Sequence, residues 1–132
     1  ILGEFNKFII EQISLKIGIS TEFVSSSNYN SINGDKDERL VNICKKLNAD
    51  DYISPIGASN YIEKNNQGGA FNNSGVNLYY QNYKHPIYRQ IHNTFVSHLS
   101  VLDLLFNQGF DNSLEIIRRG RGNLITSQTL FK

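Results

Sequence analysis

The stretch Asp51-Tyr-Ile-Ser-Pro-Ile-Gly-Ala58 is the clearest indication of the fold class, because it joins a short strand to a tight turn. Its first four residues predict a buried strand, which Pro55 and Gly57 end. Ser59 then stands where it can cap a short helix. Upstream, residues 36–48 carry acids first and apolar side chains at helical spacing afterwards, which predicts a helix. A helix that leads directly into a buried strand indicates an α/β arrangement.

The remaining elements follow from the same kind of pattern on either side. Apolar residues at helical spacing predict a first helix that ends near Lys16. Alternating residues predict two more strands, over residues 17–25 and 76–81. Two helices, over about 100–109 and 113–119, are predicted to end the ordered part. We therefore expect an α/β fold with a small, mostly parallel sheet flanked by helices, and a helical C-terminal part.

The composition indicates one globular domain. The chain has 132 residues, 39% of them hydrophobic, so we expect a single domain over residues 1–120 and a flexible tail over 121–132. A net charge of +1 gives no overall attraction to nucleic acid. The single cysteine excludes an internal disulfide and suits the cytoplasm, and no apolar run is long enough for membrane insertion. A first residue other than Met and a three-stranded sheet favour a portion of a longer protein.

The turn after the predicted strand is the first candidate for ligand binding. Ligands of open α/β sheets bind at the carboxyl ends of strands. Gly57 would let a backbone N–H approach a phosphate or a sugar hydroxyl, and Ser54 and Tyr61 would donate hydrogen bonds beside Tyr52. The alternative is a strand-to-helix turn that holds its tyrosines only for packing.

The segment His85-Pro-Ile-Tyr-Arg-Gln90 is the second candidate. Imidazole changes charge near neutral pH, so His85 is the predicted general base, with Tyr88 as its catalytic partner and Gln90 as a ligand-binding residue. Histidine before proline is also a common turn residue, which is the alternative interpretation of His85. The spacing of the three histidines does not fit a zinc site, and we expect neither a metal nor a cofactor.

Three further residues have structural interpretations. Ser100 and Asp103 form a capping-box pattern at the start of the predicted C-terminal helix. Phe71 lies in a loop rich in glycine and asparagine, and we expect it to anchor that loop to the core.

Several motifs in order resemble the WbqC-like protein family, over roughly residues 25–109. They are Arg-Leu-Val-x-Ile-Cys-Lys (39–45), Tyr52-Ile-Ser-Pro with Gly57-Ala58 and Tyr61, Phe71 before Gly75-Val76, His85-Pro-x-Tyr-x-Gln90, and Leu99-Ser-Val-Leu-Asp-Leu-Leu-Phe-Asn-x-Gly109. Members usually begin with a segment rich in glutamine, proline and tyrosine, which has no counterpart here. The chain therefore resembles the C-terminal portion of the family.

The resemblance implies a role in O-antigen or other surface-polysaccharide biosynthesis, and in lipopolysaccharide pathways of bacteria. We expect the protein to bind a nucleotide-activated sugar or a related donor and to assist modification of that sugar by group transfer. The turn residues and the segment 85–90 are expected to face one ligand. The alternative is a non-catalytic module that binds a glycan, or that associates with a missing N-terminal half or with other enzymes of the pathway.

Overall fold

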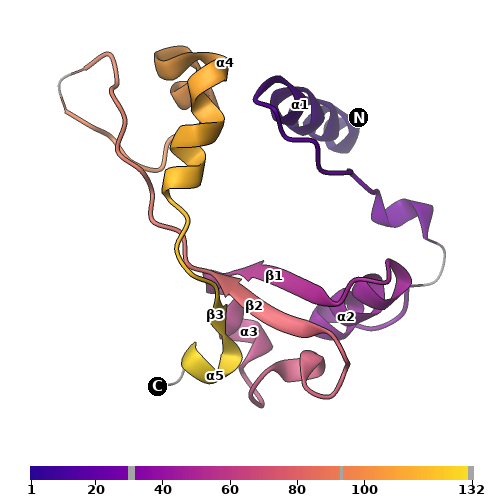
Figure 1. Ribbon diagram of the computed structural model, residues 1–132. Coiled ribbons are helices and arrows are strands. Elements are labelled where there is room, and N and C mark those ends of the chain that lie inside the picture. The colour runs from indigo at the N-terminus through magenta and orange to yellow at the C-terminus, as the bar shows by residue number, and fades with distance from the viewer. Residues whose placement is uncertain (30–31, 93, 131–132) are drawn as a thin grey trace. The chain divides into compact units, whose positions relative to one another are not determined.

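The computed structural model describes residues 1–29, 32–92 and 94–130, which form an α/β arrangement (Figure 1). In chain order the helices and strands are α1 (Leu2–Lys16), α2 (Lys36–Lys46), β1 (Asp51–Pro55), α3 (Ser59–Ile62), β2 (Asn77–Gln81), α4 (Val101–Arg119), β3 (Ile125–Thr126) and α5 (Ser127–Leu130). Three short 3₁₀ turns lie between them: η1 (Ser26–Asn28), η2 (Ile56–Ala58) and η3 (Gly69–Phe71). The α/β class predicted from the sequence is confirmed.

The sheet has three strands in the order β1-β2-β3 and is mixed. β1 and β2 are parallel, with Asp51 opposite Asn77 and Pro55 opposite Gln81. β3 is antiparallel to β2, with Thr126 opposite Tyr79, so the prediction of a mostly parallel sheet is not borne out. The physical reason is that the segment after α4 meets β2 at the C-terminal end of that strand and then runs back along it. There the N–H of Gly122 donates a hydrogen bond to the carbonyl of Asn82 (2.7 Å).

The chain divides into two compact units, where the sequence predicts one domain over residues 1–120. The first unit consists of Ile1–Phe23 and Tyr83–Arg121, and the second of the described parts of Val24–Asn82 and Gly122–Lys132. The predicted single domain and the predicted flexible tail over residues 121–132 stay predictions. β3 and α5 belong to the second unit, because Ile125 and Leu130 pack against its hydrophobic core.

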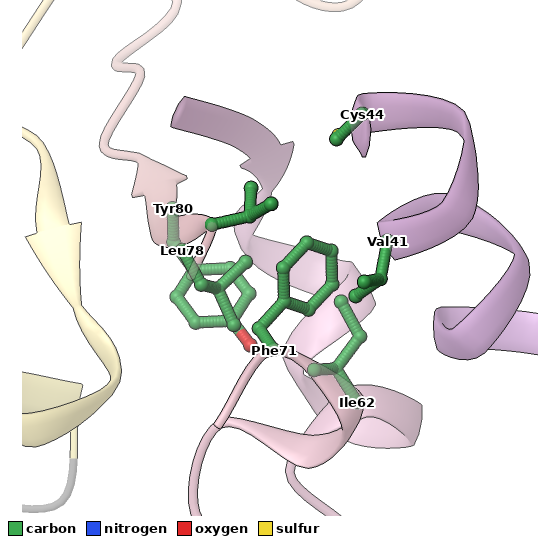
Figure 2. Close-up of a cluster of buried hydrophobic side chains, with 7 residues drawn as sticks. Val41, Cys44, Ile62, Phe71, Leu78 and Tyr80 are labelled. Atoms are coloured by element: carbon green, nitrogen blue, oxygen red, sulfur yellow. The ribbon is translucent and has the colours of Figure 1, made fainter. Parts of the chain in front are cut away.

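The core of the second unit is a cluster of buried apolar side chains around Phe71. Phe71 is 4% exposed, and Figure 2 shows its ring between Val41 of α2 and the β2 side chains Leu78 and Tyr80. The prediction that Phe71 anchors its loop to the core is confirmed. Burial, followed by a hydrogen bond from Tyr80 Oη to Glu63 Oε1 (2.6 Å), raises the pKa of the Tyr80 hydroxyl strongly.

The first unit contains α1, α4 and the long loop that precedes α4. The predicted helix ending near Lys16 is confirmed as α1, although none of its apolar side chains is buried. The predicted strand over residues 17–25 is wrong, because these residues pair with no strand of the described chain and Phe23 and Val24 are exposed. The two predicted C-terminal helices form α4, and Gly109 interrupts it with non-helical torsion angles (φ 75°, ψ 170°). A positive φ of this kind favours glycine.

Gly69 offers a test of the packing between η3 and its neighbours. Its φ is +50°, and an added Cβ would lie 2.5 Å from both Asp37 Oδ2 and the carbonyl oxygen of Ile62. We expect Gly69→Ala to lower the free energy of unfolding by about 2–3 kcal/mol, through backbone strain and this clash. Urea denaturation of the two proteins measures the difference. An unchanged midpoint would mean that the loop relaxes freely around the methyl group.

Candidate functional site

The four predicted turn residues lie in the second unit. Tyr52 and Ser54 share one face of β1, Gly57 lies in η2, and Tyr61 lies in α3. The Tyr52 ring stacks on Phe71, with ring centroids 5.1 Å apart and an interplanar angle of 16°. Burial raises the pKa of the Tyr52 hydroxyl above its ordinary value. Tyr52 is therefore a protonated, partly enclosed side chain at neutral pH.

Ser54 and Gly57 differ in what they can offer a ligand. Ser54 is 1% exposed, and its Oγ makes no hydrogen bond to any described residue. A buried hydroxyl without a well-formed hydrogen bond costs about 1–3 kcal/mol, and the interaction of Ser54 with the Tyr52 hydroxyl, which offsets part of the rise in the pKa of that tyrosine, reduces this cost. Gly57 is exposed, has no unusual φ, and has no atom within 4 Å of an added Cβ. The fold therefore does not require glycine at position 57.

The variant Gly57→Ala tests whether glycine at this position is needed for folding or for ligand binding. We expect the free energy of unfolding to change by no more than about 0.5 kcal/mol, because the added methyl group meets open space. Run beside Gly69→Ala in the same urea titration, it provides the matched control for that variant. A large loss of stability in Gly57→Ala would show that η2 needs glycine for folding. A ligand that approaches the backbone at Gly57 would bind this variant less tightly.

The three predicted residues of the first unit lie in a loop that Asp103 organises. Tyr88 Oη and Gln90 Nε2 both donate hydrogen bonds to Asp103 Oδ2, each at 2.8 Å. Asn107 Nδ2 adds a contact to Asp103 Oδ1 at 3.1 Å. Burial, and then the bond to Asp103, raises the pKa of Tyr88. A carboxylate that accepts several such bonds fixes the side chains that donate them.

Gln90 uses most of its hydrogen-bonding groups within the loop itself. Its Nε2 also donates to the carbonyl of Val96 (2.9 Å), and its Oε1 accepts from the Val96 N–H (2.8 Å). Both amide hydrogens are thus engaged, which leaves one lone pair of Oε1. The prediction that Gln90 binds a ligand stays a prediction. Its observed contacts close the loop between residues 90 and 96.

His85 has one ring nitrogen bound to the backbone and one that remains available. Its Nδ1 lies 3.1 Å from the carbonyl oxygen of Pro86. A carbonyl can only accept, so this contact places the hydrogen on Nδ1 and leaves the lone pair on Nε2. No described residue forms a hydrogen bond with Nε2. This is the tautomer that a general base at Nε2 requires.

Aromatic rings hold the His85 imidazole in place. The ring centroids of Tyr88, Phe95 and His98 lie 6.4, 6.1 and 5.0 Å from that of His85. Phe95 also meets Tyr88 edge to face at 5.2 Å. Contacts of this geometry are favourable for aromatic rings. No local pattern indicates this cluster, since Phe95 and His98 are separated from His85 by 10 and 13 positions.

An open hollow of about 420 Å³ lies beside this cluster. Its lining consists of Ile87, Tyr88, Arg89, Gln90, His92 and Phe95. The Arg89 guanidinium forms no ion pair with any described residue. Arginine binds phosphate groups through paired N–H donors. The hollow thus combines aromatic rings with a cation that is available to an anionic ligand.

Asp103 is the site residue that the sequence interpretation missed. The capping-box pattern assigns it to the helix N-terminus, and Ser100 does cap α4 by accepting from the Leu102 N–H (3.3 Å). The Asp103 carboxylate instead binds Tyr88 and Gln90. These contacts span 15 and 13 residues, so no local spacing rule could indicate them. The expectation that both candidate segments face one ligand stays a prediction.

Clusters of metal-binding side chains and membrane-spanning helices are absent from the part of the chain that is described. Within it, no group of three or more histidine, cysteine or acidic side chains could hold a metal ion. None of the helices described there is both long and apolar enough to cross a bilayer.

The WbqC-like protein family has a model that matches residues 1–115 of this chain. The chain belongs to this family. The match extends beyond residues 25–109, where the motifs of the sequence lie, and includes both candidate segments and the Asp103 network. The resemblance inferred from the sequence is therefore confirmed for this WbqC-like chain.

A curated relative comes from Mycobacterium tuberculosis (strain ATCC 25618 / H37Rv). It is the uncharacterized protein Rv1507c, 31% identical over 109 residues. The alignment covers 82% of this WbqC-like chain and 45% of the relative, so the chain spans less than half of that protein. No solved structure matches the chain.

Proposed function

We propose that this WbqC-like protein binds a nucleotide-activated sugar or a related donor and assists group transfer in surface-polysaccharide biosynthesis. The observation that carries the proposal is the His85 imidazole, with its hydrogen on Nδ1 and a lone pair at Nε2. Three aromatic rings surround this imidazole. A neutral imidazole with an available lone pair on Nε2 is the form that a general base requires.

In the proposed reaction His85 Nε2 takes the proton of an acceptor hydroxyl. The acceptor oxygen then forms a bond to the transferred group, while the bond between that group and the donor breaks. The electrons of the broken bond leave with the donor's phosphate. Tyr88 keeps its proton, because its pKa is raised and its hydroxyl donates to Asp103. It positions the ligand and the loop, and His85 carries the proton.

The hollow beside His85 suits a donor of this class. Arg89 offers a guanidinium group to a diphosphate, and His92 lies in the same lining. The rings of Tyr88 and Phe95 offer apolar surface to a base or a sugar. A nucleotide sugar combines these two chemical features, an anionic diphosphate and flat or apolar rings.

Binding is tested by titrating UDP-N-acetylglucosamine, GDP-mannose and dTDP-glucose into the protein and following the thermal midpoint. Ligand that binds the native state raises this midpoint. We expect at least one compound to do so, and expect Arg89→Gln to weaken its binding about tenfold through loss of a charged contact. Thr94→Ala, an exposed substitution in the same loop, is the control. If no nucleotide sugar shifts the midpoint, the donor assignment is wrong.

The catalytic role of His85 is tested separately from binding. We expect His85→Ala to retain donor binding but to reduce surface-polysaccharide output about 100-fold in cells that carry it as their only copy. The amount of polysaccharide extracted from a fixed mass of cells measures this output. Normal output with donor binding retained would contradict the base assignment. It would favour the alternative, a non-catalytic glycan-binding or partner module.

A further inference from the structure

A second pocket, of about 320 Å³, lies wholly within the second unit. It is at the edge of β2 that faces β3, near the start of the strand. Among the residues that the structure describes, β3 pairs with Tyr79 and Tyr80, and the chain then turns into α5. The pocket is consequently bounded by the first residues of β2, by the loop before them and by residues 126–128. This volume is at the lower end of the range for small-molecule sites.

The lining of this pocket is polar but uncharged. Besides Asn77, four of its side chains are amides, those of Gln67, Asn72, Asn73 and Gln128, and none of the described residues that line it carries a charge. Among the described residues, these four amides form no side-chain hydrogen bonds. Each amide offers two donors and a carbonyl acceptor. The pocket therefore presents both kinds of hydrogen-bonding group without an ion.

Aromatic and apolar surface completes the lining. Tyr79 contributes a partly exposed ring from β2, and Phe71, Val76 and Leu78 contribute apolar atoms from the core side. Asn77 is already engaged, because its Nδ2 donates to Asp51 Oδ1 (2.9 Å). A ligand that fits must present an apolar face together with several neutral hydroxyl or amide groups. Sites of this kind combine apolar lining with a few polar groups that fix orientation.

We propose that this pocket, called here the amide pocket, binds a single uncharged saccharide unit. Amide side chains suit hydroxyl groups, since a hydroxyl both donates and accepts. The C–H face of a sugar ring suits the Tyr79 ring and the apolar atoms beside it. Phosphorylated or carboxylated compounds fit poorly, because no cation in the lining offsets the cost of burying their charge.

The amide pocket is independent of the proposed donor site. It lies in the second unit, whereas Arg89 and His85 lie in the first. Neutral saccharides without a nucleotide probe the amide pocket alone, and nucleotide sugars probe the donor site. Failure of one proposal therefore leaves the other unaffected.

The test is an NMR titration of the ¹⁵N-labelled chain with methyl glycosides of galactose, N-acetylglucosamine and rhamnose. We expect at least one of them to shift the amide signals of residues 67–79 and 126–128, with a dissociation constant on the order of 1 mM. The double variant Asn72→Ala Gln128→Ala should weaken this binding at least tenfold. Both side chains are exposed, so their truncation leaves the fold intact.

Asn60→Ala is the matched control, because Asn60 is an exposed amide of the same unit outside the pocket. It should bind the saccharide as the wild-type chain does. The proposal is overturned if no glycoside shifts these signals at about 20 mM, or if the double variant binds as tightly as the control. It is also overturned if free nucleosides or sugar phosphates shift the same signals more strongly than the neutral glycosides.

Discussion

Phe71→Ala is expected to lower the free energy of unfolding of the second unit by about 3–5 kcal/mol. The ring is 4% exposed and lies at the centre of the cluster formed by α2, α3 and β2. Its removal deletes apolar contacts and leaves a cavity that the surrounding side chains fill only in part. It also removes the ring on which Tyr52 stacks. Urea denaturation followed by circular dichroism measures the loss.

The matched control is Phe106→Ala, since Phe106 is 87% exposed. We expect that variant to unfold within about 0.5 kcal/mol of the wild-type chain. Hydrogen exchange assigns the effect to a unit, because only amides of the second unit should lose protection in Phe71→Ala. Equal losses in the two variants would show that Phe71 is not central to this core.

Asp103→Ala is expected to release the loop that carries His85, Tyr88 and Gln90. Two hydrogen bonds to Asp103 Oδ2 are lost, and bonds to a charged acceptor contribute about 1.5–3 kcal/mol each. We therefore expect a local destabilisation of about 3–5 kcal/mol. The Val96 N–H, which donates to Gln90 Oε1, should exchange at least about 100-fold faster. Heteronuclear NMR of the exchanging chain gives this rate.

Asp111→Ala is the control for the loss of an aspartate from α4. Asp111 is exposed and forms no side-chain hydrogen bond or ion pair with any described residue. We expect the Val96 exchange rate to stay within about twofold of the wild-type rate. Tyr88→Phe, which removes one of the two donors, should give an intermediate rate. If Asp103→Ala leaves the Val96 rate unchanged, the carboxylate does not hold the loop.

Local patterns predicted most of the fold correctly. The helices α1 and α2, the strands β1 and β2 and the break at Gly109 all follow from the spacing of apolar residues or from single turn residues. The strand predicted over residues 17–25 failed, because an alternating pattern forms a strand only where a neighbouring strand accepts its hydrogen bonds. β3 was missed because two residues are too few for any periodicity.

The candidate site could be predicted only in part. The sequence indicated His85, Tyr88 and Gln90 through their chemistry and close spacing. It could not indicate that Asp103 binds two of them, or that Phe95 and His98 pack on His85, since these contacts join distant positions. Local sequence patterns could not indicate the amide pocket either, because its lining combines residues 67–79 with residues 126–128, which are far apart in the sequence.

The amino-acid sequence was sufficient to predict the α/β class and the positions of the main helices and strands, because these depend on interactions within a few residues. The order of its motifs was sufficient to indicate the family. The antiparallel direction of β3, the contacts of Asp103 and the surroundings of the His85 imidazole became visible in the folded structure alone. These features depend on which distant segments the packing of apolar side chains brings into contact. No periodicity along the chain encodes that pairing.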